Sequence, residues 1–208
     1  WYTGQYKAGE ADGTSHIFCA VSTDGIHFER VSDQPVLLPE EPWEKAAVMC
    51  PSVLWDEETG RYKMWYSAGE QYEPNAIGYA ESPDGLVWQK FTGNPIFCAD
   101  PDTEWEQHKA AGCQVLKKDE HYYMFYIGYY NEDYAQIGMA RSRDGRTGWE
   151  RSSLNPIIAP GEEGFDCCAC YKPFTVFKDG KWLLWYNGRN GTLEQIGLVT
   201  HDGYDFAF

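Results

Sequence analysis

Short runs in which apolar and polar residues alternate are the dominant pattern of this chain. Residues 61–67 are typical, with Tyr62, Met64 and Tyr66 at every second position. A period of two places such side chains on one face of a β-strand. Turn-forming stretches such as residues 82–85 separate the runs. Since no useful window shows the 3.6-residue period of an amphipathic helix, the pattern predicts an all-β protein of short antiparallel strands.

The runs belong to a longer sequence motif that recurs with a spacing of about 60 residues. An aromatic pair, an Ile-Gly step and an Asp-Gly turn follow one another in each copy, and four strand-like runs make up each repeat. Self-similarity of this kind predicts the blades of a β-propeller, with at least about 40% strand against an average of roughly 20–25%. We divide one β-propeller domain into a partial blade at 1–39 and further blades at 43–97, 105–158 and 165–208.

The blade count predicts an incomplete ring. About three and a half blades are visible, whereas closed rings have about four or five blades at the least. Trp1 lies inside a strand phrase, so we expect that one or more N-terminal strands are missing from this chain, or that a dimer completes the ring. An open blade edge presents unpaired N–H and C=O groups, through which a second copy could associate.

Composition excludes several classes of partner. With 17 basic and 32 acidic side chains, the net charge of -15 argues against nucleic acid and against anionic membrane surfaces. No run approaches the roughly 18 apolar residues of a membrane helix. Seven cysteines without a spaced framework indicate reduced, mostly buried thiols, which favours the cytoplasm and leaves secretion open. Adjacent cysteines on an extended strand point to opposite faces, so we expect 167–170 to bind no metal, and we expect no cofactor.

The phrases at 64–67 and 77–88 resemble the five-bladed β-propeller glycoside hydrolases of families 43, 32 and 130. The resemblance implies a pocket on the propeller axis, with carboxylates on the innermost strands of different blades. An inverting glycosidase needs a neutral carboxylic acid and a carboxylate roughly 6.5–9.5 Å apart. The leading hypothesis is therefore a glycoside hydrolase-like protein that acts on a neutral oligo- or polysaccharide.

The innermost strands depart from this family pattern. In family 43 such a strand often opens with an Asp-Pro pair. Here Cys50 precedes Pro51, Lys172 precedes Pro173, and the third repeat has Gly112 at this place. None of these residues is a carboxylate. The departure favours the alternative hypothesis, a non-catalytic carbohydrate-binding or interaction propeller that has lost its catalytic acids.

Four carboxylates on the expected pocket face are the catalytic candidates. Glu44, Glu106 and Asp166 occupy one aligned position in three repeats, and Glu70 follows a strand end. Their repetition also fits a structural role, in which each accepts hydrogen bonds from backbone amides where a blade begins. Catalytic acids need different environments to separate their pKa values. The aspartates of the Asp-Gly turns lie on the opposite face, where we expect them to cap turns.

The loops between the second and third strands of each blade differ between repeats, which is where a site on a repeat fold is expected. Aromatic faces beside carboxylates and amides suit sugar rings, whose C–H faces stack while their hydroxyls take hydrogen bonds. His108, as a lone histidine, also fits a structural role. The residues predicted to bind a carbohydrate ligand are Tyr72, Glu73, His108, Tyr129, Tyr130, Arg189 and Asn190.

Overall fold

The computed structural model describes residues 1–203, 206 and 208. Strands account for 53% of the residues and helix for 3%, so the prediction of an all-β chain with at least 40% strand is confirmed. The chain forms two compact units, Trp1–Ile96 and Phe97–Phe208, which are described separately below.

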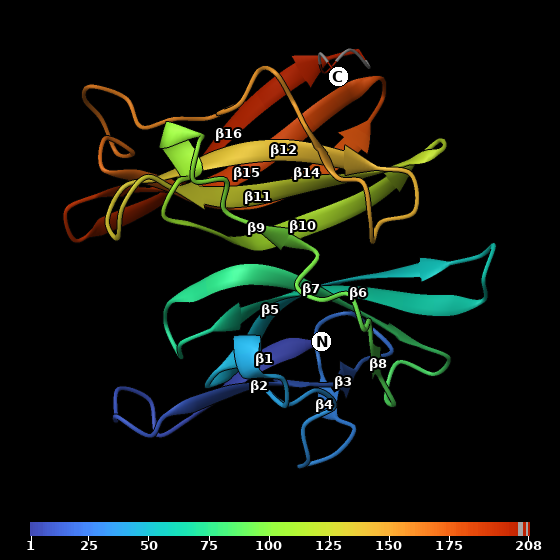
Figure 1. Cartoon of the computed structure of the whole chain (residues 1–208). Coiled ribbons are helices and arrows are strands. Elements are labelled where there is room, and N and C mark those ends of the chain that lie inside the picture. The colour runs from blue at the N-terminus through green and yellow to red at the C-terminus, as the bar shows by residue number, and fades with distance from the viewer. Residues whose placement is uncertain (204–205, 207) are drawn as a thin grey trace. The chain divides into compact units, whose positions relative to one another are not determined.

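The first unit contains eight strands and one turn of 3-10 helix (Figure 1). They are β1 (Tyr2–Tyr6), β2 (Thr14–Phe18), β3 (Ala20–Val21), β4 (Glu29–Arg30), η1 (Pro42–Glu44), β5 (Ala47–Asp56), β6 (Arg61–Gly69), β7 (Pro74–Ser82) and β8 (Gln89–Lys90). Strands β5 to β8 pair in sequence order as an antiparallel sheet. The hairpin β1–β2 joins that sheet through one parallel pair, Ser15 with Ala47, and β3 pairs with β4.

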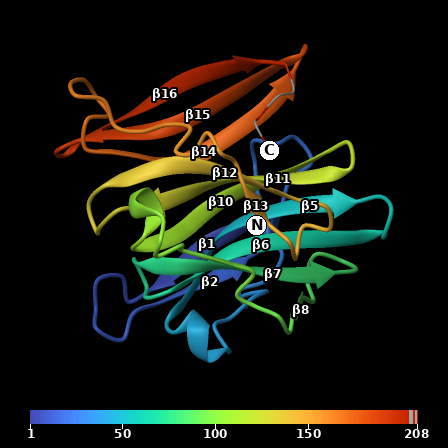
Figure 2. The same cartoon turned by 45° about the horizontal axis from the view of Figure 1, so that its top comes forward.

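The second unit holds two sheets that lie side by side (Figures 1 and 2). Its elements are β9 (Phe97–Cys98), η2 (Glu104–Glu106), β10 (Lys109–Lys118), β11 (His121–Tyr129), β12 (Ala135–Ser142), β13 (Glu150–Arg151), β14 (Ala169–Lys178), β15 (Lys181–Asn190) and β16 (Leu193–Asp202). Strands β10 to β13 form a four-stranded antiparallel sheet, and β14 to β16 form a three-stranded one.

Corresponding residues of the sequence repeats form the same strand pairings in different sheets. In three sheets the tyrosine of the aromatic pair lies opposite the glycine of the Ile-Gly step, as in Tyr66 with Gly78 and Tyr126 with Gly138. Four antiparallel strands in chain order, as in β5–β8 and β10–β13, are the arrangement of a propeller blade. The predicted fold class is therefore confirmed.

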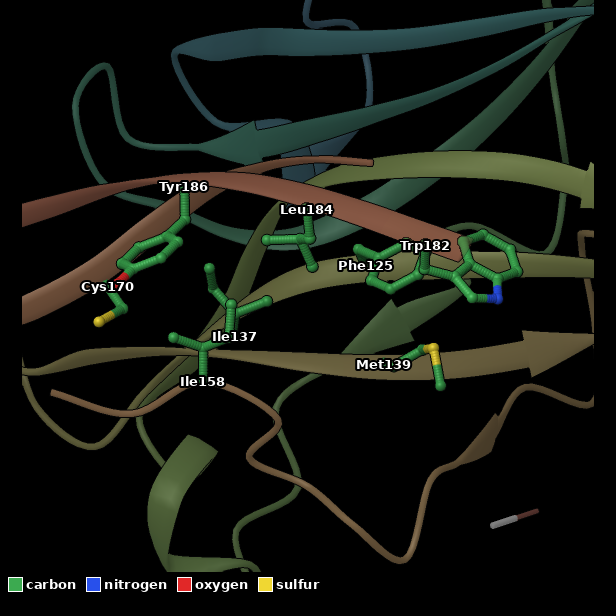
Figure 3. Packing of buried hydrophobic residues seen from close by; sticks show 8 residues of the cluster. All are labelled: Phe125, Ile137, Met139, Ile158, Cys170, Trp182, Leu184 and Tyr186. Carbon is green, nitrogen blue, oxygen red and sulfur yellow. The ribbon is translucent and has the colours of Figure 1, made fainter. Parts of the chain in front are cut away.

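Each unit has its own apolar core. In the first, Ile17 and Leu37 pack with Val48, Met64 and Tyr66. In the second, one face of β10–β13 packs against one face of β14–β16, as the labelled side chains of Figure 3 show. That core consists of Phe125, Ile137, Met139, Ile158, Cys170, Trp182, Leu184 and Tyr186. The alternation read from the sequence supplies these faces, since every second side chain of a strand points to the same side.

The other face of β14–β16 is apolar and exposed. Phe174, Ile196 and Leu198 are 56%, 75% and 50% exposed. The residues aligned with the last two in the third repeat, Ile137 and Met139, are 0% and 1% exposed because the following sheet covers them. The same repeat position is thus a core position in one sheet and a surface position in the next.

Candidate functional site

An aromatic residue, an acid and a tyrosine form one packed group in the second, third and fourth repeats. In the second repeat the rings of Trp43 and Tyr66 lie 5.9 Å apart. Both rings press on Gly78, where an added Cβ would lie 2.6 Å from Tyr66 and 2.7 Å from Trp43. The same crowding surrounds Gly138 and Gly197. The Ile-Gly step is therefore a packing requirement of the blade.

Glu44 is fully buried inside this group. Its Oε2 accepts hydrogen bonds from the backbone N–H groups of Glu40 and Glu41 at 2.7 and 2.9 Å. The ammonium of Lys90 donates to the same oxygen at 2.7 Å, and the Tyr66 hydroxyl donates to Oε1 at 2.8 Å. These contacts agree with the structural role that the sequence analysis weighed against catalysis, in which the acid accepts hydrogen bonds from backbone amides where a blade begins. A catalytic role for Glu44 stays a prediction.

Glu106 occupies the same position in the third repeat and is also fully buried. Its Oε1 accepts a hydrogen bond from Arg151, but its Oε2 has no hydrogen-bond partner in the part of the chain that the structure describes. Burial raises the pKa of Glu106, against the opposing effects of Arg151 and Tyr126. A raised pKa is what a general acid needs, yet the burial of this carboxyl group keeps it from a substrate.

Asp166, the third member, is only partly buried. Its Oδ2 accepts a hydrogen bond from the Tyr186 hydroxyl at 2.7 Å. Burial, and then this carboxylate, raise the pKa of Tyr186. Asp166 is thus the more accessible of the two predicted acids in the second unit.

The aspartates of the Asp-Gly turns cap their turns, as predicted. Asp24 Oδ1 accepts hydrogen bonds from the backbone N–H groups of Ile26 and His27, both at 2.8 Å. Asp84 and Asp144 make the same pair of bonds to the residues two and three positions further on. Asp202 forms an ion pair with Lys181 at 3.1 Å, and the two residues that it would cap, 204 and 205, lie outside the described residues. The turn role is therefore confirmed for Asp24, Asp84 and Asp144 and stays a prediction for Asp202.

The innermost strands β5, β10 and β14 carry β-bulges at one aligned place. The ladder shifts between Met49 and Ser52, between Ala111 and Cys113, and between Tyr171 and Phe174. The bulges hold Cys50, Gly112 and Lys172, with φ angles of 53°, 56° and 53°. Cys50 and Lys172 are exposed, and a non-glycine residue in this left-handed region often marks a functional site. The bulges fall at the positions where the resemblance described above implies an Asp-Pro pair.

The loop between β6 and β7 exposes the predicted residues of the first unit. Glu70 and Glu73 are exposed, and the Tyr72 ring is 50% exposed. Glu70 forms an ion pair with Lys45 at 3.2 Å. Buried Gln71 fixes the loop, because its amide donates to two backbone carbonyls of the first hairpin at 3.0 Å. Of the four predicted acids, Glu70 is therefore the one at the surface.

The third repeat carries a groove of about 550 Å³ on its loop side. Its lining residues are Glu104, Trp105, Tyr130, Asn131, Tyr134 and Gln136. The Tyr130 ring is 40% exposed and lies edge-on to the Tyr134 ring at 6.4 Å. Rings and amides lining one open groove suit a sugar ring, whose apolar face stacks while its hydroxyls are bound.

The groove loop is held in one conformation. Asn131 Oδ1 accepts the backbone N–H groups of Asp133 and Tyr134 at 2.9 and 2.8 Å. The N–H of Tyr130 donates to the carbonyl of Tyr134 at 3.1 Å. A loop fixed in this way loses little conformational entropy when a ligand binds.

The predicted residues at the start of β10 are less available. The N–H of exposed His108 donates to the carbonyl of Tyr129 at 2.9 Å. Lys109 is buried, and its ammonium lies 4.4 Å from the centre of the Tyr129 ring. Burial lowers the pKa of Lys109, with Glu132 acting in the opposite direction. One face of Tyr129 is thus occupied by a cation of the protein itself.

The fourth repeat holds a carboxylate that the sequence analysis missed. Glu194 is exposed, accepts a hydrogen bond from the Tyr171 hydroxyl and accepts another from Asn187 Nδ2 at 2.7 Å. The bond from Tyr171 and then the bond from Asn187 lower the pKa of Glu194, and the charge of Lys172 adds to the effect. Burial and the Glu194 carboxylate raise the pKa of Tyr171 to about 12. The result is an ionised carboxylate with a fixed orientation beside the bulge of β14.

A signal for this residue exists in the aligned repeats. Glu194 stands two residues before Ile196, where the second and third repeats have Asn75 and Ala135. A carboxylate present in one repeat alone is a sign of local function.

Arg189 and Asn190 mainly connect loops. Arg189 Nη2 donates to the carbonyl of Asp133 at 2.6 Å, and Asn190 Nδ2 donates to the carbonyl of Gly164 at 2.8 Å. The first bond joins the end of β15 to the groove loop of the third repeat. The groove loop is therefore linked to the β15–β16 hairpin, and Glu194 lies at the start of β16 in that hairpin.

The cysteines correct one sequence expectation. Cys167 and Cys168 lie in a bend before β14, not on an extended strand, and their Sγ atoms are 4.0 Å apart. The assumption that neighbouring thiols point apart is wrong for this pair. Three cysteines are buried, while Cys50 and Cys98 are exposed. Among residues 1–203, 206 and 208, no three His, Cys, Asp or Glu side chains are grouped to hold a metal ion.

None of the helices in the described residues has the length and apolar character that a membrane crossing requires.

Comparison with known sequences finds relatives that align with only part of their own length. No family model matches the chain. A 1,2-beta-oligomannan phosphorylase of Thermoanaerobacter sp. is 32% identical over 142 residues, which are 62% of this chain and 45% of the relative. An uncharacterized protein of Mycobacterium tuberculosis is 28% identical over 205 residues, which are 96% of this chain and 65% of the relative. A beta-1,2-mannobiose phosphorylase of Thermoanaerobacter sp. is 29% identical over 120 residues, 50% of this chain and 38% of the relative. The chain thus spans between about two fifths and two thirds of these relatives.

Comparison with solved structures confirms the expected resemblance at the level of the fold. A structure titled "Glycoside hydrolase" has a TM-score of 0.76 and 22% identity, covering 96% of this chain and 60% of its own. A thermostable family-43 glycoside hydrolase has a TM-score of 0.72 and 17% identity, covering 99% and 72%. The GH32 beta-fructofuranosidase of Bombyx mori has a TM-score of 0.67 and 19% identity, covering 97% and 44%. The fold is that of the β-propeller glycoside hydrolases.

Proposed function

We propose that this protein is carbohydrate-active and cleaves or transfers the glycosidic bond of a neutral oligosaccharide. The observation that carries the proposal is the carboxylate of Glu194, which is exposed, ionised and oriented by Tyr171 and Asn187. The names of two curated relatives, both phosphorylases of mannose-containing oligosaccharides, support the same class of ligand. The net charge of -15 disfavours an anionic sugar.

The roles follow from accessibility and charge. Glu194 serves as the ionised carboxylate that a glycosidic-bond reaction requires. Of the acids predicted from the sequence, partly buried Asp166 lies in the same unit as Glu194 and is the candidate for the second carboxyl group, while a catalytic role for exposed Glu70 of the first unit stays a prediction. Glu44 and Glu106 are assigned to the interior of their blades, because both are fully buried. The groove beside Tyr130 and Tyr134 would hold a sugar unit in the same unit as Glu194, since Arg189 joins the groove loop to the β15–β16 hairpin.

Either water or phosphate could accept the sugar. Water makes the reaction the hydrolysis that the sequence predicts. Phosphate would make it a phosphorolysis, which the names of the two relatives favour. The exposed ammonium of Lys172, at the β14 bulge next to Tyr171, is a cation that could meet a phosphate.

The test is an assay with neutral oligosaccharides, including 1,2-β-linked manno-oligosaccharides, with and without inorganic phosphate. Free sugar identifies hydrolysis and sugar 1-phosphate identifies phosphorolysis. Glu194→Gln should lower kcat by about 10²-fold, because it removes the charge and keeps the shape. Glu120→Gln, an exposed residue in the β10–β11 turn, is the matched control and should leave kcat unchanged. Full activity of the Glu194 variant would show that this assignment is wrong.

The alternative function is carbohydrate binding without catalysis. It is favoured by the bulges, which carry Cys50, Gly112 and Lys172 where a carboxylate is expected. In that case no sugar is released, while Tyr130→Ala weakens retention of the protein in a gel that contains a neutral polysaccharide. Stacking on one ring corresponds to a loss of about 10-fold in affinity.

The cytoplasmic location and the association of a second copy through an open blade edge also remain proposals. Among the described residues, β1 and β16 are edge strands of their sheets, which is the geometry that such an association needs. Sedimentation of the 208-residue chain would reveal a dimer.

A further inference from the structure

Two adjacent thiols lie at the entry to the fourth repeat. Cys167 and Cys168 form part of the bend before β14, and their Sγ atoms are 4.0 Å apart. Both residues are partly exposed. The third cysteine of this segment, Cys170, is instead fully buried in the core of the second unit, together with Ile158 and Tyr186 (Figure 3). The sulfur chemistry that a reagent in solution can reach in this segment is therefore that of the adjacent pair.

The fold does not require thiols at these two positions. They are occupied by a lysine and an alanine in the second repeat, and by a glutamine and a histidine in the third. In each repeat the second residue of the pair, Ala46, His108 or Cys168, donates its backbone N–H to a carbonyl at the end of the neighbouring strand, at 3.1, 2.9 and 2.9 Å. The blade keeps this hydrogen bond with three unrelated side chains, so the thiols are available for chemistry.

The first residue of the pair adopts different backbone conformations in this fold. Lys45 has φ and ψ angles of 49° and -109°, whereas the aligned Gln107 has angles of -56° and -25°. The hydrogen bond of the following residue is present in both repeats. Cys167 occupies the same position, so its backbone can rotate while the entry to β14 stays paired. Closure of a disulfide between neighbouring residues needs such a rotation.

We propose that Cys167 and Cys168 are a reversible oxidation site, at which hydrogen peroxide converts the two thiols into a disulfide. In the first step a thiolate attacks one peroxide oxygen, the O–O bond breaks, and a sulfenic acid and hydroxide form. In the second step the neighbouring thiol attacks the sulfenic sulfur, the S–S bond forms, and the S–O bond breaks with loss of water. The two thiols lose two electrons and two protons, and the peroxide is reduced to two molecules of water.

The disulfide is expected to be easily reduced. Consecutive Cα atoms are about 3.8 Å apart, whereas the Cα atoms of most disulfides are about 4.4–6.8 Å apart. A strained disulfide has a high reduction potential and is reopened by thiols. Partial burial, and then the contact with Cys168, raise the pKa of Cys167. Since the thiolate is the reacting form, oxidation is slow at neutral pH and the pair is reduced at rest.

The pair directly follows a candidate residue of the carbohydrate site. Asp166 precedes Cys167 in the chain, and its Oδ2 accepts a hydrogen bond from the Tyr186 hydroxyl at 2.7 Å. Rotation of the Cys167 backbone on oxidation changes the segment that carries this carboxylate. The oxidation itself does not depend on the proposed function, and its test uses no sugar.

The test treats the intact chain with a small excess of hydrogen peroxide, blocks the remaining thiols after denaturation, and maps residues 167–170 by mass spectrometry. Wild-type protein should contain a disulfide between Cys167 and Cys168, with Cys170 carrying the blocking group. A dithiol reductant should restore both thiols. The proposal fails if the two cysteines stay thiols or become separate sulfinic acids, or if the bridge joins Cys170 instead.

Phenylarsine oxide tests the proximity of the two thiols without oxidation, because it releases water when it binds two thiols at once. One arsenical per chain should stay bound in an excess of a monothiol. Cys168→Ala should abolish this retention, and the variant is expected to fold because Ala46 stands at the aligned position. Cys98→Ser, which changes another exposed thiol, is the matched control and should behave like wild type. Equal retention by Cys168→Ala and wild type would overturn the proposal.

Discussion

The second and third repeats place a buried glutamate at the same position but give it different hydrogen-bond partners. Glu44 and Glu106 are both fully buried beside an aromatic ring and a tyrosine. Glu44 receives hydrogen bonds from two backbone amides, Lys90 and Tyr66. Glu106 receives hydrogen bonds from Arg151 and Tyr126 but none from a backbone amide, and its Oε2 has no partner among the described residues. The loop that leads into a blade therefore decides whether the repeated acid is fully satisfied.

The bulges of the innermost strands show the same contrast. Cys50 and Gly112 have nearly equal φ angles of 53° and 56°. Glycine adopts this conformation at little cost, whereas cysteine is strained there. The buried glutamate of the second repeat thus has more hydrogen-bond partners than that of the third, while the backbone of its β-bulge is more strained.

The largest expected effect is that of Glu44→Gln. The change removes the buried carboxylate that lies 2.7 Å from the ammonium of Lys90, which is 12% exposed, and leaves it only the exposed carboxylate of Glu40 at 3.4 Å. We expect a loss of about 3 kcal/mol in the free energy of unfolding, measured by urea denaturation. Glu57→Gln, in an exposed turn, serves as the control and should have little effect. A loss below about 1 kcal/mol would mean that the bonds to Glu44 contribute little net stability.

An intermediate effect is expected from Gly112→Ala. Alanine is disfavoured at this φ, and its Cβ would lie 2.6 Å from Ile127 Cδ1. We expect a loss of about 2 kcal/mol in unfolding free energy. Gly60→Ala separates the two causes, because Gly60 has a φ of 61° and no atom within 4 Å of an added Cβ. If both variants lose equally, the contact with Ile127 is irrelevant.

The smallest effect concerns Glu106→Gln and its dependence on pH. Because burial raises the pKa of Glu106, the folded state binds more protons than the unfolded state between the usual glutamate pKa and the raised one. This carboxyl group therefore lowers stability as the pH rises through that window, and the loss is complete above it. Glutamine has no such dependence.

The variant should consequently gain stability relative to wild type as the pH rises, with a net change within about 1 kcal/mol at neutral pH. Urea midpoints of both proteins from pH 4 to 8 provide the measurement. A constant difference across this range would contradict a raised pKa for Glu106.

The fold could be predicted because its causes are local and repeated. Alternation with a period of two identifies strands such as β6. The Asp-Gly turns are recognisable from the sequence, and so are the hydrogen bonds that their aspartates accept, as at Asp84. Spacing then aligned the ladders, including the pairing of Tyr66 with Gly78. These features need only near neighbours along the chain.

The candidate site could be predicted only in part, because its contacts span strands. Tyr130 was identified as a loop aromatic, but its groove depends on Trp105, 25 residues earlier in the chain. The bond from Tyr171 to Glu194 joins β14 to β16, and although the aligned repeats single out the carboxylate of Glu194, they do not show its partner. Tyr129 was identified by its position, yet Lys109 covers one of its faces. Which face of a ring is free depends on the packing of side chains from another strand.

The exposed face of β14–β16 has a consequence for colloidal behaviour. Ile196 and Leu198 lie open to solvent on a chain with a net charge of -15. The charge keeps molecules apart, whereas the apolar face favours their adhesion. Added salt shortens the screening length from about 10 Å at 0.1 M to about 3 Å at 1 M, which weakens the repulsion and leaves the apolar attraction in place. Solutions of this protein should therefore stay clear at low ionic strength and turn turbid first in strongly salting-out buffers.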